Sequence, residues 1–283
     1  MTTISLSEFG EHELMTDSTD PDSSPLFEAK EFDESSVFTP KALLDNARRQ
    51  KDLPERSVPE ICILDPDGDI VRQLTATGEA QTDEAWPGYH TDLYRLERNG
   101  EEFGIVGCAV GAPFAVLLAE QLFAAGCQFL ISVTSSGQIV PKDDPPYFVL
   151  IERALRDEGT SHHYRSRSRY AALDDELRAS VEEACATVSR PVYTGATWTT
   201  DSPFRETEAA IERARSEGIL AVEMEAAALY TFADVRDRSV VCFAHVTNQM
   251  GQSEEEFEKG EANGSRDALE VITTAATAWR SLK

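Results

Sequence analysis

Glu223 and Glu225 flank Met224 in the stretch LAVEMEAAAL, where an apolar run gives way to an alanine-rich one. The change of pattern predicts a strand that ends near Met224 and a helix that begins at Glu225. A helix N-terminus favours an anion, so we expect the pKa of Glu225 to be lowered. An ionised carboxylate only accepts hydrogen bonds, which suits two adjacent sugar hydroxyls, and Met224 offers an apolar wall beside them. The alternative is that both acids simply begin a helix.

Small polar residues follow two further apolar runs. Thr134, Ser135, Ser136 and Gly137 are expected to form a loop after a buried strand, and Gly111 precedes a predicted helix. Hydroxyls and free backbone N–H groups at such places suit the oxygen atoms of a phosphate or a sugar. Helix capping and tight turns need the same residue types, so both interpretations stay open.

The stretch ATWTTDSPFRET combines aromatic and hydrogen-bonding side chains. Trp198 and Phe204 offer apolar surface, and Asp201 and Arg205 accompany them, so this segment is a candidate for holding a planar base. A packed strand end followed by a helix cap at Asp201 or Ser202 explains the same residues.

Another apolar run ends in AHVTNQ, which places His245 and Asn248 near the end of a predicted strand. We take both as candidate catalytic residues. The alternative for His245 is a structural role, which is usual for a lone histidine in a strand.

Apolar β-type runs and helical patterns alternate along the chain after the first 35 or so residues. Such alternation predicts an α/β fold with a largely parallel or mixed sheet covered on both faces, in which ligands bind beyond the carboxyl ends of strands. The pair Asn99-Gly100 predicts a hairpin turn. Strands are expected in 59–65, 92–98, 101–110, 127–137, 190–200, 219–224 and 239–248, helices in 112–126, 174–188, 202–218, 225–235 and 265–282, and a strand with a helical end in 146–159.

The composition limits the classes of partner. The formal net charge of −25 disfavours nucleic acid and anionic membranes. No run approaches the roughly 18 apolar residues of a membrane span, and the first residues lack the pattern of a signal peptide, so we expect a soluble, cytoplasmic protein. Residues 1–35 are acidic and rich in Ser, Asp and Pro, which predicts a flexible or loosely docked arm before a single domain over 36–283. The five cysteines form no CxxC pair and are expected to be buried, reduced thiols.

In their order along the chain, these motifs resemble the nucleoside phosphorylase superfamily, which includes uridine phosphorylases, hexameric purine nucleoside phosphorylases and methylthioadenosine nucleosidases. VEMEAAAL is similar to the family's Glu-Met-Glu ribose motif, VGCAVGAPFAVLLAEQLFAAGCQFLISVTSSGQI to its Gly-x-Gly-x-Pro helix and Thr/Ser-Gly loop, and TWTTDSPFRET to its base-side loop. The resemblance implies a three-layer α/β/α fold around a mixed, partly closed sheet. It also implies cleavage of a ribosyl N-glycosidic bond, with inorganic phosphate as co-substrate and with neither a metal nor an organic cofactor.

The resemblance also implies roles on the sugar side of the site. Glu225 would bind the ribose 2′- and 3′-hydroxyls, Met224 would lie beside the sugar, and Glu223 would support the site. The small residues 134–137, together with Gly111, would contact phosphate or the ribose.

On the base side, the resemblance implies that Phe204 stacks on the base and that Arg205 reaches its carbonyls or the phosphate. Asn248 stands where purine phosphorylases carry an aspartate that protonates the leaving base, and uridine phosphorylases have an asparagine near this place. This departure favours a pyrimidine-type enzyme close to uridine phosphorylase. The family assembles as dimers or as hexamers built from dimers, so a homo-oligomer is expected.

The chain departs from the family where phosphate is bound. Gly68 stands where the family's Gly-Asp-Pro-x-Arg loop carries its arginine, and Ile131 or Ser132 replaces a second arginine. A third arginine is expected near WPGYHTD, which contains none. Phosphate recognition normally uses such forked donors.

Three functions therefore stay open. The first, which we favour, is phosphorolysis, with phosphate held by hydroxyls, backbone N–H groups and a relocated arginine such as Arg205. In the second, water replaces phosphate and Asp67 or Asp69 acts as the general base of a nucleosidase. In the third, the chain binds a nucleoside without cleaving it.

Overall fold

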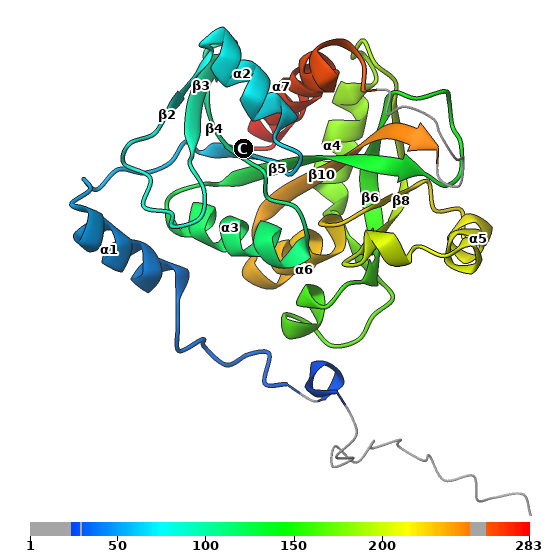
Figure 1. Cartoon of the computed structure of the whole chain (residues 1–283), viewed down its shortest axis with the longest axis horizontal. Coiled ribbons are helices and arrows are strands. Elements are labelled where there is room, and N and C mark those ends of the chain that lie inside the picture. The colour runs from blue at the N-terminus through cyan, green and yellow to red at the C-terminus, as the bar shows by residue number, and fades with distance from the viewer. Residues whose placement is uncertain (1–23, 29, 250–258) are drawn as a thin grey trace, which may run out of the picture.

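A mixed ten-stranded sheet forms the centre of the computed structural model, which describes residues 24–28, 30–249 and 259–283 (Figure 1). The strand order is β10-β6-β8-β9-β5-β1-β4-β3-β2, and β7 pairs with β6. Because β10 also pairs with β5, the strands β5, β9, β8, β6 and β10 close into a ring. The strands are β1 (Ile61–Asp65), β2 (Ala80–Thr82), β3 (Tyr94–Arg98), β4 (Glu101–Gly107), β5 (Phe129–Gln138), β6 (Tyr147–Asp157), β7 (Tyr170–Ala172), β8 (Val192–Thr200), β9 (Ala221–Glu223) and β10 (Ser239–Gln249).

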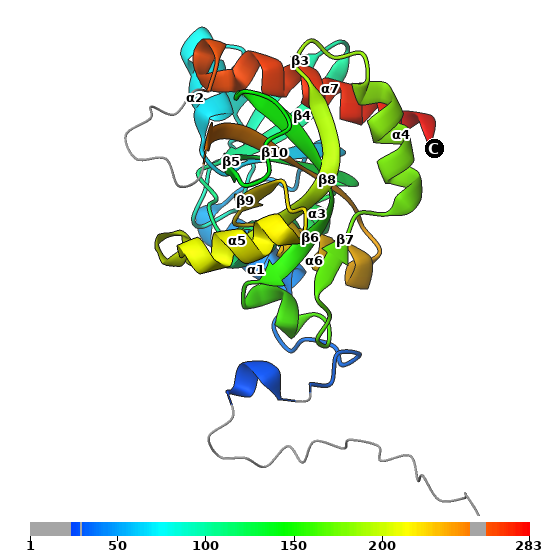
Figure 2. The same cartoon turned by 90° about the vertical axis from the view of Figure 1, so that its right-hand side faces the viewer.

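Helices cover both faces of this sheet (Figures 1 and 2). On one face α3 packs against α6 and α1 against α3, and on the other α7 packs against α4 and α2. The predicted three-layer α/β/α fold with a mixed, partly closed sheet is therefore confirmed. The α-helices are α1 (Pro40–Lys51), α2 (Asp69–Thr77), α3 (Ala112–Ala124), α4 (Asp175–Cys185), α5 (Glu208–Ser216), α6 (Ala226–Arg236) and α7 (Ser265–Ser281), and the 3-10 helices are η1 (Pro25–Phe27), η2 (Thr160–His163), η3 (Pro203–Arg205) and η4 (Glu261–Gly264).

The continuous apolar runs of the sequence become strands that are buried on both sides. Every residue of β1 is buried, as expected for a strand between two helix layers. The hairpin predicted between β3 and β4 is confirmed. Asn99 and Gly100 have φ values of 53° and 78°, and both lie in the left-handed region that a tight hairpin turn requires.

Two local predictions are wrong because neighbouring strands override the local pattern. Residues 153–157 continue strand β6 instead of forming a helix, since β8 pairs along one edge of this segment and β7 along the other. Residues 134–137 lie within β5 instead of a loop, since β10 and β9 extend beside them. Helices α1 and α2 and strands β2 and β7 were not predicted.

The predictions for the cysteines and for the N-terminal arm are confirmed or described only in part. Four cysteines are buried as expected, but Cys108 is exposed. Of the predicted arm, residues 24–28 and 30–35 are described and include η1, whereas residues 1–23 lie outside the described residues. Within the described ranges, no helix is long and apolar enough to cross a membrane.

Candidate active site

Glu225 lies at the N-terminus of α6 and is almost completely buried, with 1% of its surface exposed. Its Oε1 accepts a hydrogen bond from the backbone N–H of Gly111, at 2.7 Å, just before α3. Its Oε2 is buried and has no hydrogen-bond partner among the described residues. A buried acceptor without a partner is costly, so this oxygen is the strongest indication of a ligand site in the fold.

The pKa of Glu225 is raised to about 8, because burial disfavours its charged form and Glu223 lies nearby. The hydrogen bond from Gly111 and the nearby hydroxyl of Thr134 oppose this rise but do not cancel it. The expected lowering of this pKa by the helix N-terminus is therefore wrong, since desolvation outweighs the helix dipole. Donor groups of a ligand at Oε2 favour the ionised form.

Glu223, by contrast, has four hydrogen-bond donors around its carboxylate. Its Oε1 accepts the hydroxyls of Thr197 and Thr199 from β8, and its Oε2 accepts the backbone N–H groups of Glu225 and Ala226, each at 2.7 Å. Because both oxygens are occupied, Glu223 caps α6 and positions Glu225 and has no free acceptor for a sugar. The support role given to Glu223 fits this geometry.

Alternate residues of β5 turn their side chains toward Glu225. The hydroxyl of Thr134 lies close enough to the Glu225 carboxyl to lower its pKa, and Ser132 and Ser136 lie on the same face because side chains alternate along a strand. The hydroxyls of Ser132 and Ser136 are buried and unpartnered within the described part of the chain. Three unpartnered oxygens, one carboxylate and two hydroxyls, thus belong to one face of the sheet. Such a polar set matches a ligand rich in hydroxyls.

Asp67 lies in the connection between β1 and α2, and its Oδ2 accepts the backbone N–H of Ser135 at 2.7 Å. This N–H is one of the groups expected to hold an oxygen of phosphate. Asp65 is turned inward, where it accepts the N–H groups of Gly68 and Val71 and caps α2, and burial raises its pKa to about 7. Of the three aspartates in this segment, Asp67 is therefore the one directed at the candidate site.

Two cations lie at the same connection. Arg72 donates to the Asp69 carboxylate at 2.6 Å and to the backbone oxygen of Asp67 at 2.8 Å, and Lys259 also binds Asp69 at 2.6 Å. Arg205, the expected substitute for the missing arginines, is exposed on η3. The structure therefore offers Arg72 and Lys259 as cations close to Asp67, although both are already paired with Asp69.

His245 lies on the opposite face of the sheet from Glu225. It pairs with Ser135 in the β10–β5 register, its ring stacks on Phe148 with the centroids 4.6 Å apart, and Gly264 at the start of α7 lies against its Cε1. Burial and the charge of Lys259 lower its pKa to about 4, so it is neutral near pH 7. Asn248, the other candidate catalytic residue, is half-buried and pairs with Gly137.

The base-side residues are not gathered around Glu225. Trp198 is buried and donates to Asp157 at 2.9 Å, and Asp201 accepts the backbone N–H of Gly159 at 2.8 Å. Phe204 is fully exposed, and Met224 on the sugar side is half-buried. Neither Trp198 nor Phe204 is thus shown in position to stack on a base beside Glu225.

Sequence reasoning missed several contributors to the site. The sequence indicated Ser132 only as a residue that stands in place of a phosphate-binding arginine. It did not link Thr197 and Thr199 to Glu223. The alternation of the two threonines on β8 was the available signal, because it places both hydroxyls on one face. Their pairing with Glu223 depends on β8 lying next to β9, which the sequence does not reveal.

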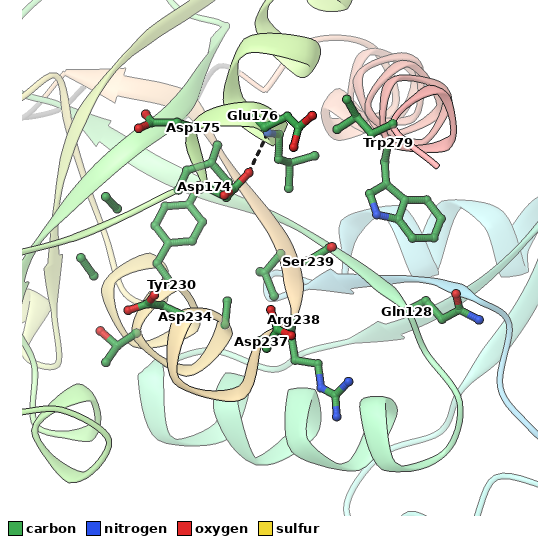
Figure 3. A pocket seen from close by; sticks show the side chains of 18 of the residues that line it. Gln128, Asp174, Asp175, Glu176, Tyr230, Asp234, Asp237, Arg238, Ser239 and Trp279 are labelled. Atoms are coloured by element: carbon green, nitrogen blue, oxygen red, sulfur yellow. Dashed lines mark hydrogen bonds between the residues drawn. The ribbon is translucent and has the colours of Figure 1, made fainter. Parts of the chain in front are cut away.

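A cavity of about 1020 Å³ lies at the other end of α6 (Figure 3). It opens near the first residues of β5 and β10, where Gln128 and Ser239 lie. Figure 3 shows Asp237 next to Arg238, and Asp234 next to Tyr230. This cavity lies away from Glu225 and adds nothing to the candidate site.

Comparisons with known proteins show the family of this chain and agree with its fold. The family model of the phosphorylase superfamily matches residues 60–277, and the chain belongs to this family. A uridine phosphorylase of Thermococcus kodakarensis is 28% identical over 237 residues, covering 77% of this chain and 79% of the relative. A guanosine phosphorylase of Halorubrum lacusprofundi is 24% identical over 188 residues, covering 64% of this chain and 78% of the relative. The crystal structure of a uridine phosphorylase from Vibrio fischeri ES114 has the same fold, with a TM-score of 0.68, 21% identity, and coverage of 81% of this chain and 96% of that one.

Proposed function

We propose that this protein cleaves the N-glycosidic bond of a ribonucleoside and transfers the ribosyl group to inorganic phosphate. The products are the free base and ribose 1-phosphate, which makes the enzyme a pentosyltransferase, and a uridine-type substrate is favoured. The observation that carries the proposal is the buried Glu225 carboxylate, with one oxygen held by Gly111 and the other unpartnered. The named activities of the relatives support phosphate as the acceptor.

In this mechanism the free oxygen of Glu225 accepts the ribose 2′- and 3′-hydroxyls and fixes the sugar. As the bond between C1′ and the base nitrogen breaks, positive charge develops on the sugar, and the nearby carboxylate stabilises it. A phosphate oxygen forms the new bond to C1′, and the electron pair of the broken bond leaves with the base. Asn248 is proposed to hydrogen-bond the departing base.

Phosphate is proposed to bind at residues 134–137, through hydroxyls and backbone N–H groups. Arg72 and Lys259 are proposed to bind phosphate here. Each would then give up part of its ion pair with Asp69. No metal or organic cofactor is needed for these steps. We further propose a cytoplasmic homodimer or a hexamer built from dimers.

A second candidate is hydrolysis, favoured by the hydrogen bond between Asp67 and the N–H of Ser135. A carboxylate that occupies this N–H competes with phosphate for it and adds negative charge. Asp67 is also suited to take a proton from water, so the same residue would act as the general base of a nucleosidase.

The experiment is base release from uridine, inosine, adenosine and methylthioadenosine, each with and without phosphate. The proposal expects release that depends on phosphate and yields ribose 1-phosphate. Release without phosphate, yielding free ribose, would establish the second candidate instead. Nucleoside binding without release under either condition would contradict both and leave a binding protein.

A further inference from the structure

Glu158 follows directly after strand β6 and is buried, with 5% of its surface exposed. Its Oε2 accepts the backbone N–H of Ser161 at 2.9 Å, at the first turn of η2. Its Oε1 is buried and unpartnered among the described residues, as is Oε2 of Glu225. One oxygen suffices for the contact with η2, so the second requires another explanation.

The strand register places Glu158 level with the candidate site. Asp157 pairs with Thr200 of β8, and Thr199 pairs with Glu223 of β9. The bond from the Gly159 N–H to Asp201 continues the alignment of β6 and β8 past their ends. Two strand spacings, about 10 Å, therefore separate the chain at Glu158 from the chain near Glu225.

Glu158 also lies on the same face of the sheet as Glu223. Side chains alternate along β8, so Thr199, which binds Glu223, is on the face opposite Trp198. Trp198 binds Asp157, which puts Asp157 on its own face and the next residue, Glu158, on that of Thr199. The packing of η2 against α6 is consistent with this placement.

Neighbouring cations do not satisfy the free oxygen of Glu158. Arg156, two residues earlier on the same face, makes its hydrogen bonds with other partners, which are Ser161, Ser168, His162 and the backbone oxygens of Arg165 and Ser166. Burial raises the pKa of Glu158, and the nearby carboxylate of Asp201 adds to this rise. The free oxygen can therefore accept a hydrogen bond from a donor group of a ligand.

We infer that Glu158 recognises the base, and that its free oxygen accepts a ring N–H at the end of a nucleoside whose ribose is held by Glu225. The inference rests on the proposed nucleoside-cleaving function and names the substrate class for it. Uracil, hypoxanthine and guanine carry a ring N–H beside a carbonyl, whereas cytosine and adenine carry an unprotonated nitrogen there. A ring N–H donated to the free oxygen favours the ionised form of Glu158, and an ionised carboxylate has no donor for an unprotonated ring nitrogen. The site therefore selects the first group.

The test compares the wild type with Glu158→Gln, which keeps the size of the side chain and an acceptor for Ser161. The kcat/KM values of uridine against cytidine, and of inosine against adenosine, are measured under the conditions that support base release. In the wild type we expect kcat/KM for uridine to exceed that for cytidine, and kcat/KM for inosine to exceed that for adenosine, each by at least about 100-fold. In Glu158→Gln each ratio should fall by about tenfold or more, because an amide both donates and accepts.

Glu120→Gln is the matched control, since Glu120 is a half-buried carboxyl on α3 that binds Tyr164 and Arg236 and has no role in the proposed site. This variant should leave both ratios unchanged. Thermal unfolding of each variant reports any purely structural role, which would lower the melting temperature without moving the ratios. Unchanged ratios in Glu158→Gln, or no preference in the wild type, would overturn the inference while leaving the proposed function intact.

If the wild type releases no base, the proposed function fails separately. The same ratios are then measured as binding constants by titration calorimetry, and the same change in Glu158→Gln is expected. Absence of any nucleoside binding would overturn the inference together with the function.

Discussion

The carboxylate of Asp67 accepts the backbone N–H of Ser135 at 2.7 Å, across 68 positions of the chain. This contact joins the end of β1 to the polar face of β5, and it places a negative charge where the proposed reaction needs an anionic acceptor. How phosphate and Asp67 share this place decides between the two candidate reactions.

Asp67→Asn tests this relationship directly. The amide oxygen still accepts the Ser135 N–H, but the negative charge is lost. Under phosphorolysis we expect the KM for phosphate to fall by about tenfold, roughly 1.4 kcal/mol, because a repulsion is removed. Steady-state kinetics at varied phosphate measures this change.

Under hydrolysis the same variant behaves in the opposite way. Loss of a general base lowers release by about 10²- to 10⁴-fold. A large loss of phosphate-independent release would therefore contradict the phosphorolysis proposal and assign Asp67 to water activation.

Glu225→Gln tests the ribose assignment. One acceptor oxygen becomes an amide donor that faces a sugar hydroxyl, so an interaction that stabilises the transition state is lost. We expect kcat/KM to fall by about 10²- to 10³-fold with the fold intact. Base-release kinetics and circular dichroism check the two parts, and near-normal kinetics would remove Glu225 from the sugar site.

The raised pKa of Glu225 predicts a pH dependence of stability. Its pKa is about 8 in the folded chain against an ordinary value of 4.5. The unfolded chain therefore loses this proton first as the pH rises. The stabilisation is complete below about pH 4.5, declines as the pH rises to about 8, and is on the order of 3–5 kcal/mol in total.

Denaturant unfolding of the wild type and of Glu225→Gln at pH 5 and pH 9 measures this effect. The free energy of unfolding of the wild type should drop relative to the variant between the two pH values. Asp65, whose pKa is also raised, titrates in both proteins and cancels in the comparison. A difference that is the same at both pH values would show that Glu225 ionises normally.

Glu223→Ala should destabilise the fold more than Glu225→Ala does. It leaves two hydroxyls and two backbone N–H groups without their acceptor, whereas removal of Glu225 frees only the N–H of Gly111 among the described hydrogen bonds. A loss of about 3–5 kcal/mol is expected for Glu223→Ala. Urea unfolding at pH 8 gives both values, and equal losses would contradict the capping role of Glu223.

Local patterns predicted most of the helices and strands, and the position of Glu225, but not α1, α2, β2 or β7. The Asn99-Gly100 turn, the apolar runs of β1 and β5 and the amphipathic helices follow from residue types that act over a few positions. The Glu-Met-Glu stretch placed a carboxylate at a strand-to-helix junction for the same reason, and the structure has α6 beginning there. Local patterns failed in β6, where a helical spacing became strand because both edges are paired.

The sequence by itself determined the α/β architecture and the carboxylate at the start of α6, because periodicity and junction chemistry are encoded locally. Only the tertiary structure decided what each acid does. Both oxygens of Glu223 are occupied, one by hydroxyls of β8 and the other by backbone N–H groups at the start of α6. Glu225 and Glu158 each keep one free oxygen, and Asp67 binds the N–H of Ser135. The hydrogen-bond partners and the burial of these acids depend on segments that are far apart in the chain. Burial even raised the pKa of Glu225, which was expected to be lowered, since desolvation depends on the whole fold.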